Sequence, residues 1–381
     1  MFFSYIAYAF IVFNFYLGKK FYNIYSYLLL KRNKKVSLKI FLLVYTLCSL
    51  PFVLPFMLSS SSGSGFLMAF RNISYYVLIF FLYAGIFFLL SELVLLGLKL
   101  FKVYKKPVSK KLLFKTSCIV LAASFLMFSY NSINALFIKT VSYEVETTKS
   151  SSINELNIAF ISDLHLGYDE KYLERIVDKV NSLNPDIILL GGDIFDGRVE
   201  DLTEIDALKI YFSNFKSKYG TFACLGNHDR RGESDLLNEI LSDGNVQVLY
   251  DEFMNFDNEF ILVGRRDLNE ARRGTRKEIN YDSPEFDKNL PIIVIDHQPN
   301  AYTDYPDFVD LILSGHTHRG QIIPLNFITS MVHIQDYGYY RESGNRPQMI
   351  VSSGVGTWGP RMRSGSSNEI LNIKFVFSQK S

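Results

Sequence analysis

Hydrophobic and polar positions divide this chain into two parts with different patterns. Apolar residues dominate long stretches of the first 140 residues, whereas after about Glu144 short apolar runs alternate with charged segments of both signs. Long apolar runs suit helices inside a bilayer, and short alternating runs suit a soluble domain. We therefore predict an all-α transmembrane region over 1–140, a linker over 141–152 and one globular domain over 153–378.

Four apolar runs are candidate membrane spans, each of which needs roughly 20 residues. The short first run lacks the basic start of a cleaved signal peptide, so we expect it to be retained. Lysine and arginine are concentrated between the first and second runs and between the third and fourth, and such loops stay in the cytoplasm. This predicts a multi-pass protein of the cytoplasmic (inner) membrane with its globular domain outside the cytoplasm. The runs are Phe2–Leu17, Ile40–Leu58, Ile73–Leu98 and Thr116–Ile138.

The membrane part is interpreted as an anchor, because it shows no internal repeat of the kind that transporters use. Glu92 lies late in the third run. A functional intramembrane carboxylate is one interpretation, and a residue near the cytoplasmic interface is the simpler one that we favour.

The globular part alternates between predicted strands and helices, which indicates an α/β fold. Short apolar runs rich in β-branched residues end at Gly, Asp or Asn, and segments with helical spacing follow them. The predicted helices are Asp169–Leu183, Leu202–Phe215 and Ser234–Leu241. The predicted strands are Leu156–Ile161, Ile187–Leu190, Thr221–Leu225, Phe260–Val263, Pro291–Ile295, Leu311–Leu313, Gln321–Ile323, Met349–Val351 and Ile370–Phe377.

Five of the six histidines lie in short motifs together with Asp, Asn and Gly. The motifs follow the predicted strands, and ligands in open α/β sheets bind where the carboxyl ends of the strands meet. Hard oxygen ligands mixed with imidazole are typical of a site for two divalent cations. The motifs are Asp163-Leu-His165, Gly192-Asp193, Gly226-Asn227-His228-Asp229, His297 and Gly315-His316-Thr-His318.

This ordered set resembles the motifs of the calcineurin-like metallophosphoesterase family, over roughly residues 153–378. The block Gly315–Gln321 and the tail that runs from Ser353 to Arg361 resemble a membrane-anchored bacterial branch, although Arg319 stands where that branch usually has Gly. The resemblance implies a four-layer αββα sandwich, in which two facing β-sheets are flanked by helices and two metals lie at one edge.

The resemblance also implies a role for each motif residue. Asp163, His165 and His318 would bind the first metal, Asp193 would bridge both, and Asn227, His297 and His316 would bind the second. A hydroxide that bridges the metals would attack phosphorus. His228 would contact the phosphate and assist the leaving group as a catalytic residue, and we expect Asp229 to orient it. Mixed nitrogen and oxygen ligands do not distinguish Mn, Fe, Zn and Co.

Other polar residues have competing interpretations. We expect Asp196 to be a carboxylate that either caps a loop or lies behind the metal ligands without binding the metal, and the isolated His333 to be a structural or surface residue. Arg319 either points outward or meets a substrate phosphate. The arginines between Arg265 and Arg276 form either a solvated loop or a flap that grips a polar lipid head. Three residues are candidates for the substrate mouth: Trp358, Arg361 and Arg363.

Composition narrows the function. The net charge is only +2, so a nucleic-acid partner is not expected. The three cysteines include no Cys-x-x-Cys pair, which argues against a thiolate zinc site. We predict a phosphohydrolase that cleaves a phosphoester or pyrophosphate bond of a lipid-linked substrate, because an anchored site meets lipid head groups at high effective concentration. The alternatives are a phosphodiesterase or nuclease for soluble substrates, and a membrane receptor or scaffold without activity.

Overall fold

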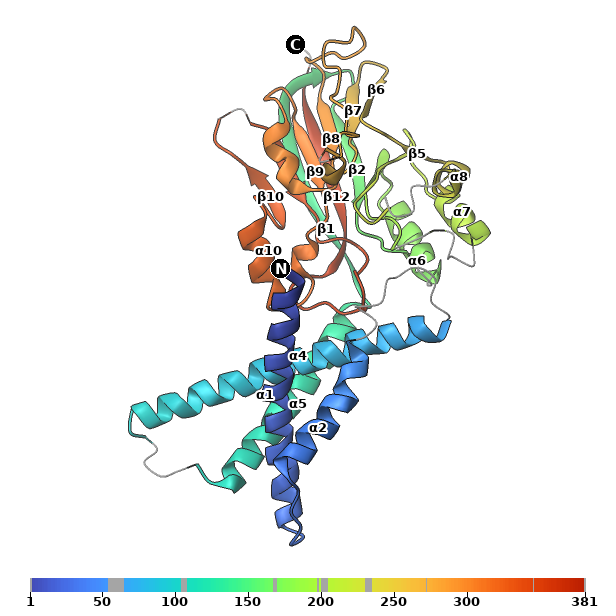
Figure 1. Ribbon diagram of the computed structural model, residues 1–381. Helices are drawn as coiled ribbons and strands as arrows, with labels where there is room; N and C mark the ends of the chain where they lie inside the picture. The colour runs from blue at the N-terminus through green and yellow to red at the C-terminus, as the bar shows by residue number, and fades with distance from the viewer. Residues whose placement is uncertain are drawn as a thin grey trace. The chain divides into compact units, whose positions relative to one another are not determined.

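The structure is a computed structural model that describes residues 2–53, 65–103, 108–166, 170–196, 199, 205–229, 235–271, 273–344 and 346–379. The chain forms two compact units, Met1–Ser132 and Ile133–Ser381. The boundary therefore falls before the expected position at residue 140. Figure 1 shows both units.

The described part of the first unit contains helices and the short segments that connect them, and no strand. Its buried core includes Leu17, Ala84, Phe88 and Val120. Within the described residues, two helices are long and apolar enough to cross a membrane, Ala69–Leu100 and Lys110–Asn134. The helices are α1 (Phe2–Leu30), α2 (Leu38–Ser49), η1 (Leu50–Phe52), α4 (Gly65–Leu100) and α5 (Lys110–Asn134).

Two of the four predicted spans thus correspond to helices that meet the length and composition of a membrane span. The first predicted span lies in α1, and the second corresponds to the shorter apolar helix Leu38–Phe52, with residues 54–58 outside the described part. The last span was predicted to reach Ile138, which is wrong, because α5 ends at Asn134 and Ile138 begins a strand. A count of four spans stays a prediction.

The second unit contains two six-stranded sheets. The parallel neighbours β2, β3, β4 and β5 form most of the first sheet, and β7, β8, β9 and β11 form the parallel part of the second. The first sheet contains, in order, β1 (Ile138–Ser151), β12 (Asn368–Gln379), β2 (Glu155–Ile161), β3 (Ile187–Gly191), β4 (Thr221–Cys224) and β5 (Val246–Val248). The second contains β10 (Gly338–Arg341), β11 (Gln348–Val351), β9 (Leu311–Ser314), β8 (Ile292–Ile295), β7 (Phe260–Gly264) and β6 (Glu252–Phe256).

The residues expected to form a linker over 141–152 instead lie mostly in β1. This strand pairs in parallel with β12 from Ile138↔Asn368 onward. The alternation of half-buried and exposed positions in β1 is typical of a strand that covers a core with one face. Long-range pairing, which a local pattern does not reveal, makes this segment part of the globular unit.

Side chains of β2 alternate between two hydrophobic cores, as the two-residue period of a strand requires. Ile158 and Phe160 belong to the core between the two sheets, together with Ile187 and Leu189 of β3. Ala159 and Ile161 belong to the core on the outer face of the first sheet. Because both faces are covered, the strand reads as a continuous apolar run in the sequence.

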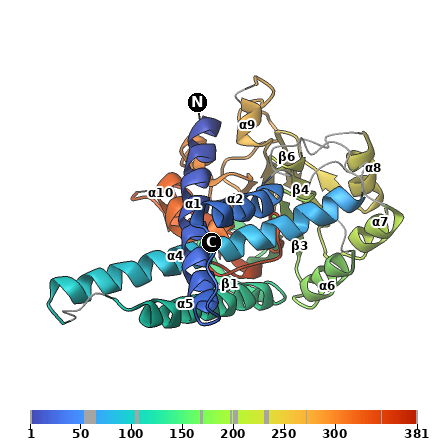
Figure 2. The same ribbon diagram turned by 60° about the horizontal axis from the view of Figure 1, so that its bottom comes forward.

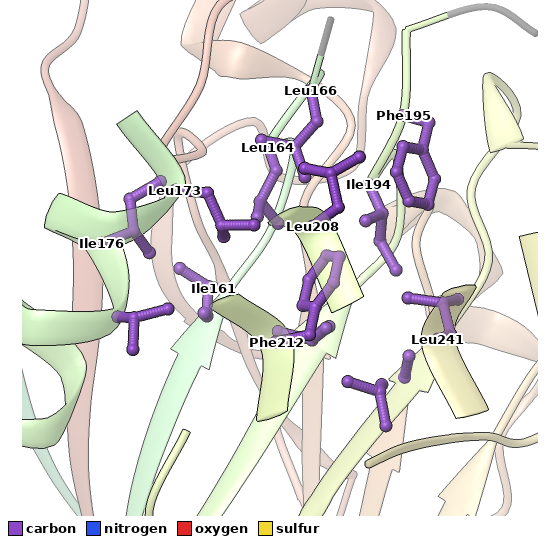
Figure 3. Close-up of a cluster of buried hydrophobic side chains, with 14 of the residues drawn as sticks. Ile161, Leu164, Leu166, Leu173, Ile176, Ile194, Phe195, Leu208, Phe212 and Leu241 are labelled. Atoms are coloured by element: carbon purple, nitrogen blue, oxygen red, sulfur yellow. The ribbon is translucent and has the colours of Figure 1, made fainter. Parts of the chain in front are cut away.

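Three amphipathic helices cover the outer face of the first sheet. They are α6 (Glu170–Asn181), α7 (Ile205–Ser213) and α8 (Asp235–Asp243). Leu173 and Ile176 of α6 and Leu208 and Phe212 of α7 pack against Ile161 of β2 and its neighbours (Figure 3). Figure 2 shows these helices on one side of the second unit and α10 (Leu325–Val332) on the other.

The outer face of the second sheet is covered differently. Val263, Val294 and Ile312 pack there against Tyr302 and Val309, which lie in or near the short helix η4 (Pro299–Asp304). The predicted sandwich is confirmed as two facing sheets with helices, but its fourth layer consists of η4 and loop segments around residues 279–290. The predicted strand Gln321–Ile323 is wrong, because these residues form a turn before α10.

Within the arginine segment 265–276, Arg265 and Arg276 pair with carboxylates of the second unit, so these two do not form a lipid-gripping flap. Nη2 of Arg276 lies 2.6 Å from Asp296 Oδ2, and Nη1 of Arg276 donates to Arg266 O at 2.8 Å. The Arg265 side chain is nearly buried, and its Nε lies 3.5 Å from an oxygen of Asp251. Arg273 is exposed, and for this part of the segment the flap and the solvated loop both stay predictions. The short helix α9 (Leu268–Ala271) lies in the segment, and Arg272 and the predicted turn glycine Gly167 lie outside the described residues.

Ile187 provides a test of the core between the sheets. It is fully buried, so Ile187→Ala should lower the free energy of unfolding of the second unit by about 2–5 kcal/mol. The fluorescence of Trp358, the single tryptophan, reports this during chemical denaturation of the full chain in detergent. The control Ile210→Ala, on the exposed face of α7, should change the value by less than about 0.5 kcal/mol. Equal effects of the two substitutions would contradict the core assignment.

Candidate metal centre

The structure brings the predicted ligands to one edge of the second unit. Asp163 and His165 follow β2, Asp193 follows β3, His297 follows β8 and the remaining histidines follow β9. Side-chain atoms that suit a cation lie within 4.8 Å of one another in three groups of described residues, and two of these groups consist entirely of predicted ligands. The first cluster is Asp163, His165 and His318, and the second is Asp193, His297 and His316. The third group is His165, Asp196 and His228.

Unusual backbone conformations aim these side chains into the centre. Five of the six clustered residues have a positive φ, a region that residues other than glycine rarely adopt. Such strain persists only where the surrounding structure enforces it, and it concentrates at functional sites. The φ values are 54° for Asp163, 47° for His165, 51° for Asp193, 73° for His316 and 49° for His318.

Two glycines make room for the carboxylates. A Cβ at Gly226 would collide with the carboxylate of Asp193, and a Cβ at Gly315 would collide with that of Asp163. Any larger residue would displace the acid that it contacts. Glycine is therefore the residue that fits directly before Asn227 and directly before His316, because it has no side chain.

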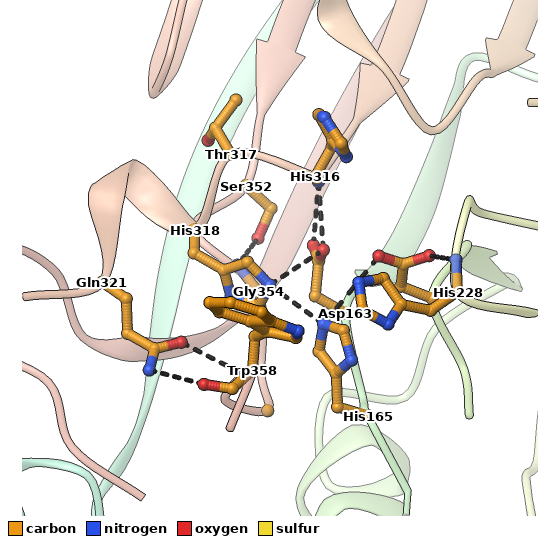
Figure 4. Close-up of polar contacts among 12 residues, drawn as sticks. Asp163, His165, His228, His316, Thr317, His318, Gln321, Ser352, Gly354 and Trp358 are labelled. Atoms are coloured by element: carbon orange, nitrogen blue, oxygen red, sulfur yellow. Dashed lines mark hydrogen bonds and ion pairs between the residues drawn. The ribbon is translucent and has the colours of Figure 1, made fainter. Parts of the chain in front are cut away.

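The first cluster joins two loops that lie far apart in the sequence. His318 Nε2 lies 3.0 Å from His165 Nε2 and 3.4 Å from Asp163 Oδ1 (Figure 4). The backbone N–H of His316 donates to both oxygens of Asp163 at 3.1 Å. Asp163 is thereby held in place, while the two imidazole nitrogens converge on one point.

The second cluster surrounds Asp193. His297 Nε2 lies 3.2 Å from Asp193 Oδ2 and 3.3 Å from His316 Nδ1. His297 Nδ1 donates to Gly191 O at 2.8 Å, so Nε2 is the nitrogen that faces the centre. Asp193 Oδ2 also lies 3.9 Å from His165 Nε2, which places this carboxylate within reach of both clusters.

Burial and neighbouring charges set the ionisation of the centre. Burial lowers the pKa of His165 to about 4 and that of His316 to about 3, so both imidazoles are neutral at pH 7 and have a lone pair for a cation. Burial also raises the pKa of Asp163 to about 6. Burial alone would raise the pKa of Asp193, but attraction to His297 outweighs it and holds that pKa below its ordinary value.

His228 faces a different carboxylate from the one predicted. Its Nδ1 lies 3.2 Å from Asp196 Oδ1, and that contact helps to raise the pKa of His228 above its ordinary value although burial opposes it. Asp229 instead accepts hydrogen bonds from the N–H groups of Phe195 and Gly226, each at 2.8 Å. The expected orienting role of Asp229 is therefore corrected: Asp196 faces the ring, and Asp229 fixes the loops. The Asp193-x-x-Asp196 spacing was the available sequence signal.

Arg363 is fully buried, which contradicts its predicted place at a substrate mouth. Its guanidinium donates to the carbonyl oxygens of His318 at 3.3 Å and of Gly354 at 3.2 Å, and also to Gly356 O at 2.5 Å. Its Nη2 lies 3.2 Å from His318 Nδ1. Burial lowers the pKa of Arg363 to about 10, so it stays charged at neutral pH. Arg363 thus clamps His318 to the Gly354–Gly356 turn.

Aromatic and cationic side chains lie around the centre. The half-exposed Trp358 ring lies 6.4 Å from the ring of His228. Gln321 Oε1 accepts a hydrogen bond from the backbone N–H of Trp358, and Gln321 Nε2 donates one to its backbone carbonyl. Arg319 is exposed and its guanidinium lies over the Tyr337 ring at 4.3 Å. His333 lies 5.7 Å from the ring of His316, so it is a neighbour of the centre that the sequence pattern did not reveal.

Comparisons with known proteins agree with this geometry. The family model "Calcineurin-like phosphoesterase" matches residues 156–320. An uncharacterized metallophosphoesterase of Campylobacter jejuni is 34% identical over 279 residues, which cover 69% of this chain and 70% of that protein. The chain belongs to the calcineurin-like phosphoesterase family. Its second unit is a metal-dependent phosphoesterase domain, and the family uses two divalent metals.

Two further matches differ in what they cover. One is a Danio rerio protein named "Transmembrane protein with metallophosphoesterase domain", which is 33% identical to this chain. The match covers 62% of this chain and 56% of the Danio rerio protein. The solved NAD nucleotidase of Haemophilus influenzae is 15% identical, with a TM-score of 0.35, over 53% of this chain and 51% of its own.

The side chains present suit two divalent cations. Each cluster combines a carboxylate with two imidazoles, the mixed donor set that such ions accept. Asn227 Oδ1 is buried and has no hydrogen-bond partner among the described residues, and the same holds for His165 Nδ1. Buried polar atoms are usually paired, so an unpaired amide oxygen beside Asp193 fits a ligand position.

Removing the Arg363 clamp should weaken the first cluster without unfolding the protein. Arg363→Met keeps the volume but leaves the carbonyls of His318 and Gly354 without their donor, and we expect metal affinity to fall about 10–100-fold. Calorimetric titration of the metal-stripped full chain with Mn²⁺ measures this. The matched control Arg361→Met, at a partly exposed arginine, should keep wild-type affinity. Unchanged affinity in Arg363→Met would show that the clamp does not position His318.

Proposed function

We propose that the second unit hydrolyses the phosphoester or pyrophosphate bond of a lipid-linked substrate with two divalent cations. The observation that carries the proposal is the pair of clusters joined at Asp193, whose Oδ2 lies 3.2 Å from His297 Nε2 and 3.9 Å from His165 Nε2. A carboxylate shared in this way holds two cations close together, as two-metal hydrolases require.

Each ligand has an assigned place in this proposal. Asp163, His165 and His318 would hold one cation, Asn227, His297 and His316 would hold the other, and Asp193 would be shared by both. When bound, such cations accept charge from phosphoryl oxygens and make a water a better nucleophile at neutral pH. The neutral state of His165 and His316 keeps their nitrogens available without prior loss of a proton.

His228 supplies the proton transfer. Asp196 engages its Nδ1, which leaves Nε2 for the substrate. A raised pKa favours the protonated ring near neutral pH, so His228 donates a hydrogen bond to the phosphate and then a proton to the leaving oxygen. The half-exposed ring of Trp358 lies 6.4 Å from the ring of His228, so it borders this side of the centre.

A lipid-linked substrate is supported by the first unit. Its helices Ala69–Leu100 and Lys110–Asn134 are long and apolar enough to hold the domain at a bilayer. Tethering raises the effective concentration of lipid head groups at the centre. A soluble phosphodiester is the competing substrate class, and a receptor without activity is disfavoured because both clusters have a complete donor set.

Loss of the shared carboxylate should abolish both metal binding and turnover. We expect Asp193→Asn to bind fewer than two Mn²⁺ per chain and to lose at least about 100-fold in kcat/KM, because changes beyond the ligands already cost 10–100-fold. Elemental analysis and phosphate release from a lipid phosphate in mixed micelles and from a soluble diester measure this in the full chain.

The charge-matched control is Asp206→Asn, on the exposed first turn of α7, which should behave as wild type. Activity in Asp193→Asn equal to that of Asp206→Asn would exclude the two-metal reaction. A wild-type chain that prefers the soluble diester would exclude the lipid-linked substrate and retain the metal chemistry.

The topology is a separate part of the proposal: the catalytic unit lies outside the cytoplasmic membrane. The segments 18–39 and 99–115 are rich in lysine, which supports a cytoplasmic position for both. Alkaline phosphatase fused after Ser381 should therefore be active, and a green fluorescent protein at the same place should be dark. A control fusion after Val103 should show the opposite pair of signals. Fluorescence from the green fluorescent protein after Ser381 would show the opposite orientation, with the catalytic unit in the cytoplasm.

A further inference from the structure

The helix α10 exposes its apolar side chains, whereas a helix on the surface of a soluble protein turns such side chains toward the core. It begins seven residues after His318 in the sequence, and none of its residues is buried. Phe327 is 62% exposed, Ile328 51%, Met331 77% and Val332 64%. At 100° per residue these four side chains occupy one face, which a soluble helix would turn toward its core.

Polar contacts hold the opposite face of α10 against the second unit. Thr329 Oγ1 donates to Asp336 Oδ2 at 2.8 Å. Asn326 lies against Gly320 and Gly365, so close that a Cβ on Gly320 would collide with the Asn326 backbone. The Ile323 N–H at the start of the helix donates to Ser364 Oγ at 2.9 Å. The outward direction of the apolar face is therefore fixed by the fold.

The exposed apolar surface extends beyond the helix. Ile323 and Ile334, which flank the helix, add to it together with Leu325 of its first turn, and residues 320–335 contain no Asp, Glu, Lys or Arg. Contiguous apolar surfaces of this kind mark interaction sites. Without fixed charges the segment carries no desolvation penalty for ions when it enters an apolar environment.

The residues at the start of the second unit indicate which partner covers the apolar face of α10. Ile133, Leu136 and Phe137 are all exposed, and they directly follow or end the helix Lys110–Asn134, which is long and apolar enough to span a membrane. The Asn134 amide donates to Arg363 O at 3.0 Å and to Ser366 O at 3.1 Å. Ser364 of the same short loop accepts a hydrogen bond from the N–H of Ile323, which lies two residues before α10. The end of the span and α10 are thus attached to one loop.

From this arrangement we propose that α10 docks on the lipid bilayer, with Phe327, Ile328, Met331 and Val332 inserted among the acyl chains. A span that ends at Asn134 leaves that residue at the membrane surface, and the loop 363–366 that Asn134 contacts also accepts the Ile323 N–H just before α10. Interfacial helices of this type bury their apolar face about 5–10 Å into the boundary of head groups and acyl chains.

Docking of α10 also places the metal centre next to the membrane. The His316 ring lies 5.7 Å from the ring of His333, which caps the end of α10, and His318 precedes the helix in the sequence. The proposal concerns a surface and its partner, and it holds whether the substrate is a lipid or a soluble phosphate.

The single tryptophan makes a direct test feasible. In a Trp358→Phe background, Phe327→Trp is the only indole of the full chain, reconstituted in vesicles of phosphatidylcholine and phosphatidylglycerol. Lipids brominated on the acyl chains should quench its emission by at least half relative to unbrominated lipids. The control Ile210→Trp, on the exposed face of α7, should not be quenched.

A second pair of variants tests the apolar face itself. In the Phe327→Trp chain, Met331→Asp should reduce the quenching at least twofold, because a carboxylate resists entry into hydrocarbon. Ser330→Asp introduces the same charge at the edge of the face and should leave the quenching unchanged. Met331 and Ser330 are both exposed, so neither substitution should change the stability of the fold appreciably.

Three results would overturn the proposal. An indole at 327 that brominated lipid does not quench but aqueous iodide does would place α10 in water. An indole that neither quencher reaches would show that protein covers α10, either a second copy of the chain or the helices of its first unit. Equal quenching of the Met331→Asp and Ser330→Asp chains would likewise exclude insertion of this face.

Discussion

The centre depends on one carboxylate, that of Asp193, within reach of imidazoles from both clusters. Its Oδ2 faces His297 and His165, while its Oδ1 accepts the His228 N–H at 2.8 Å. A carboxylate buried to this degree is costly unless positive charge or hydrogen bonds compensate it. The His228 N–H and the neighbouring His297 meet that requirement, and the absence of a side chain at Gly226 leaves room for the carboxylate. The same arrangement creates a place for two cations.

The sheets make this arrangement rigid. Strands that share an edge bring together side chains separated by more than a hundred positions, and the cores on both faces prevent the strand ends from moving. The left-handed conformations at Asp163, Asp193 and His316 would relax in a flexible loop. They persist because β2, β3 and β9 anchor the residues immediately before them. The rigidity of the core thus contributes directly to the geometry of the site.

Two features of the second unit reverse the usual distribution of residues. Arg363, a charged side chain, is fully buried, whereas the apolar face of α10 is exposed. Both are connected through the loop 363–366, which contacts the His318 turn, the start of α10 and Asn134. A single loop therefore links the ligand that closes the first cluster, the apolar helix and the end of a candidate membrane span.

The sequence by itself determined the class of the molecule and the membership of the centre. Helical and strand periods are local, and each ligand motif directly follows a short apolar run, so both could be recognised without knowledge of distant contacts. The pairing of β1 with β12 could not, because it joins Ile138 to Asn368 across most of the second unit.

The tertiary structure alone decided which carboxylate faces His228, that Arg363 lies inside and that α10 turns its apolar face outward. In each case the neighbours come from distant segments: Asp196 reaches His228 from the loop after β3, and Ser364 orients the start of α10. A local pattern states which side chains lie on one face. Only the contacts of the folded chain determine what that face meets, because burial is a property of both partners.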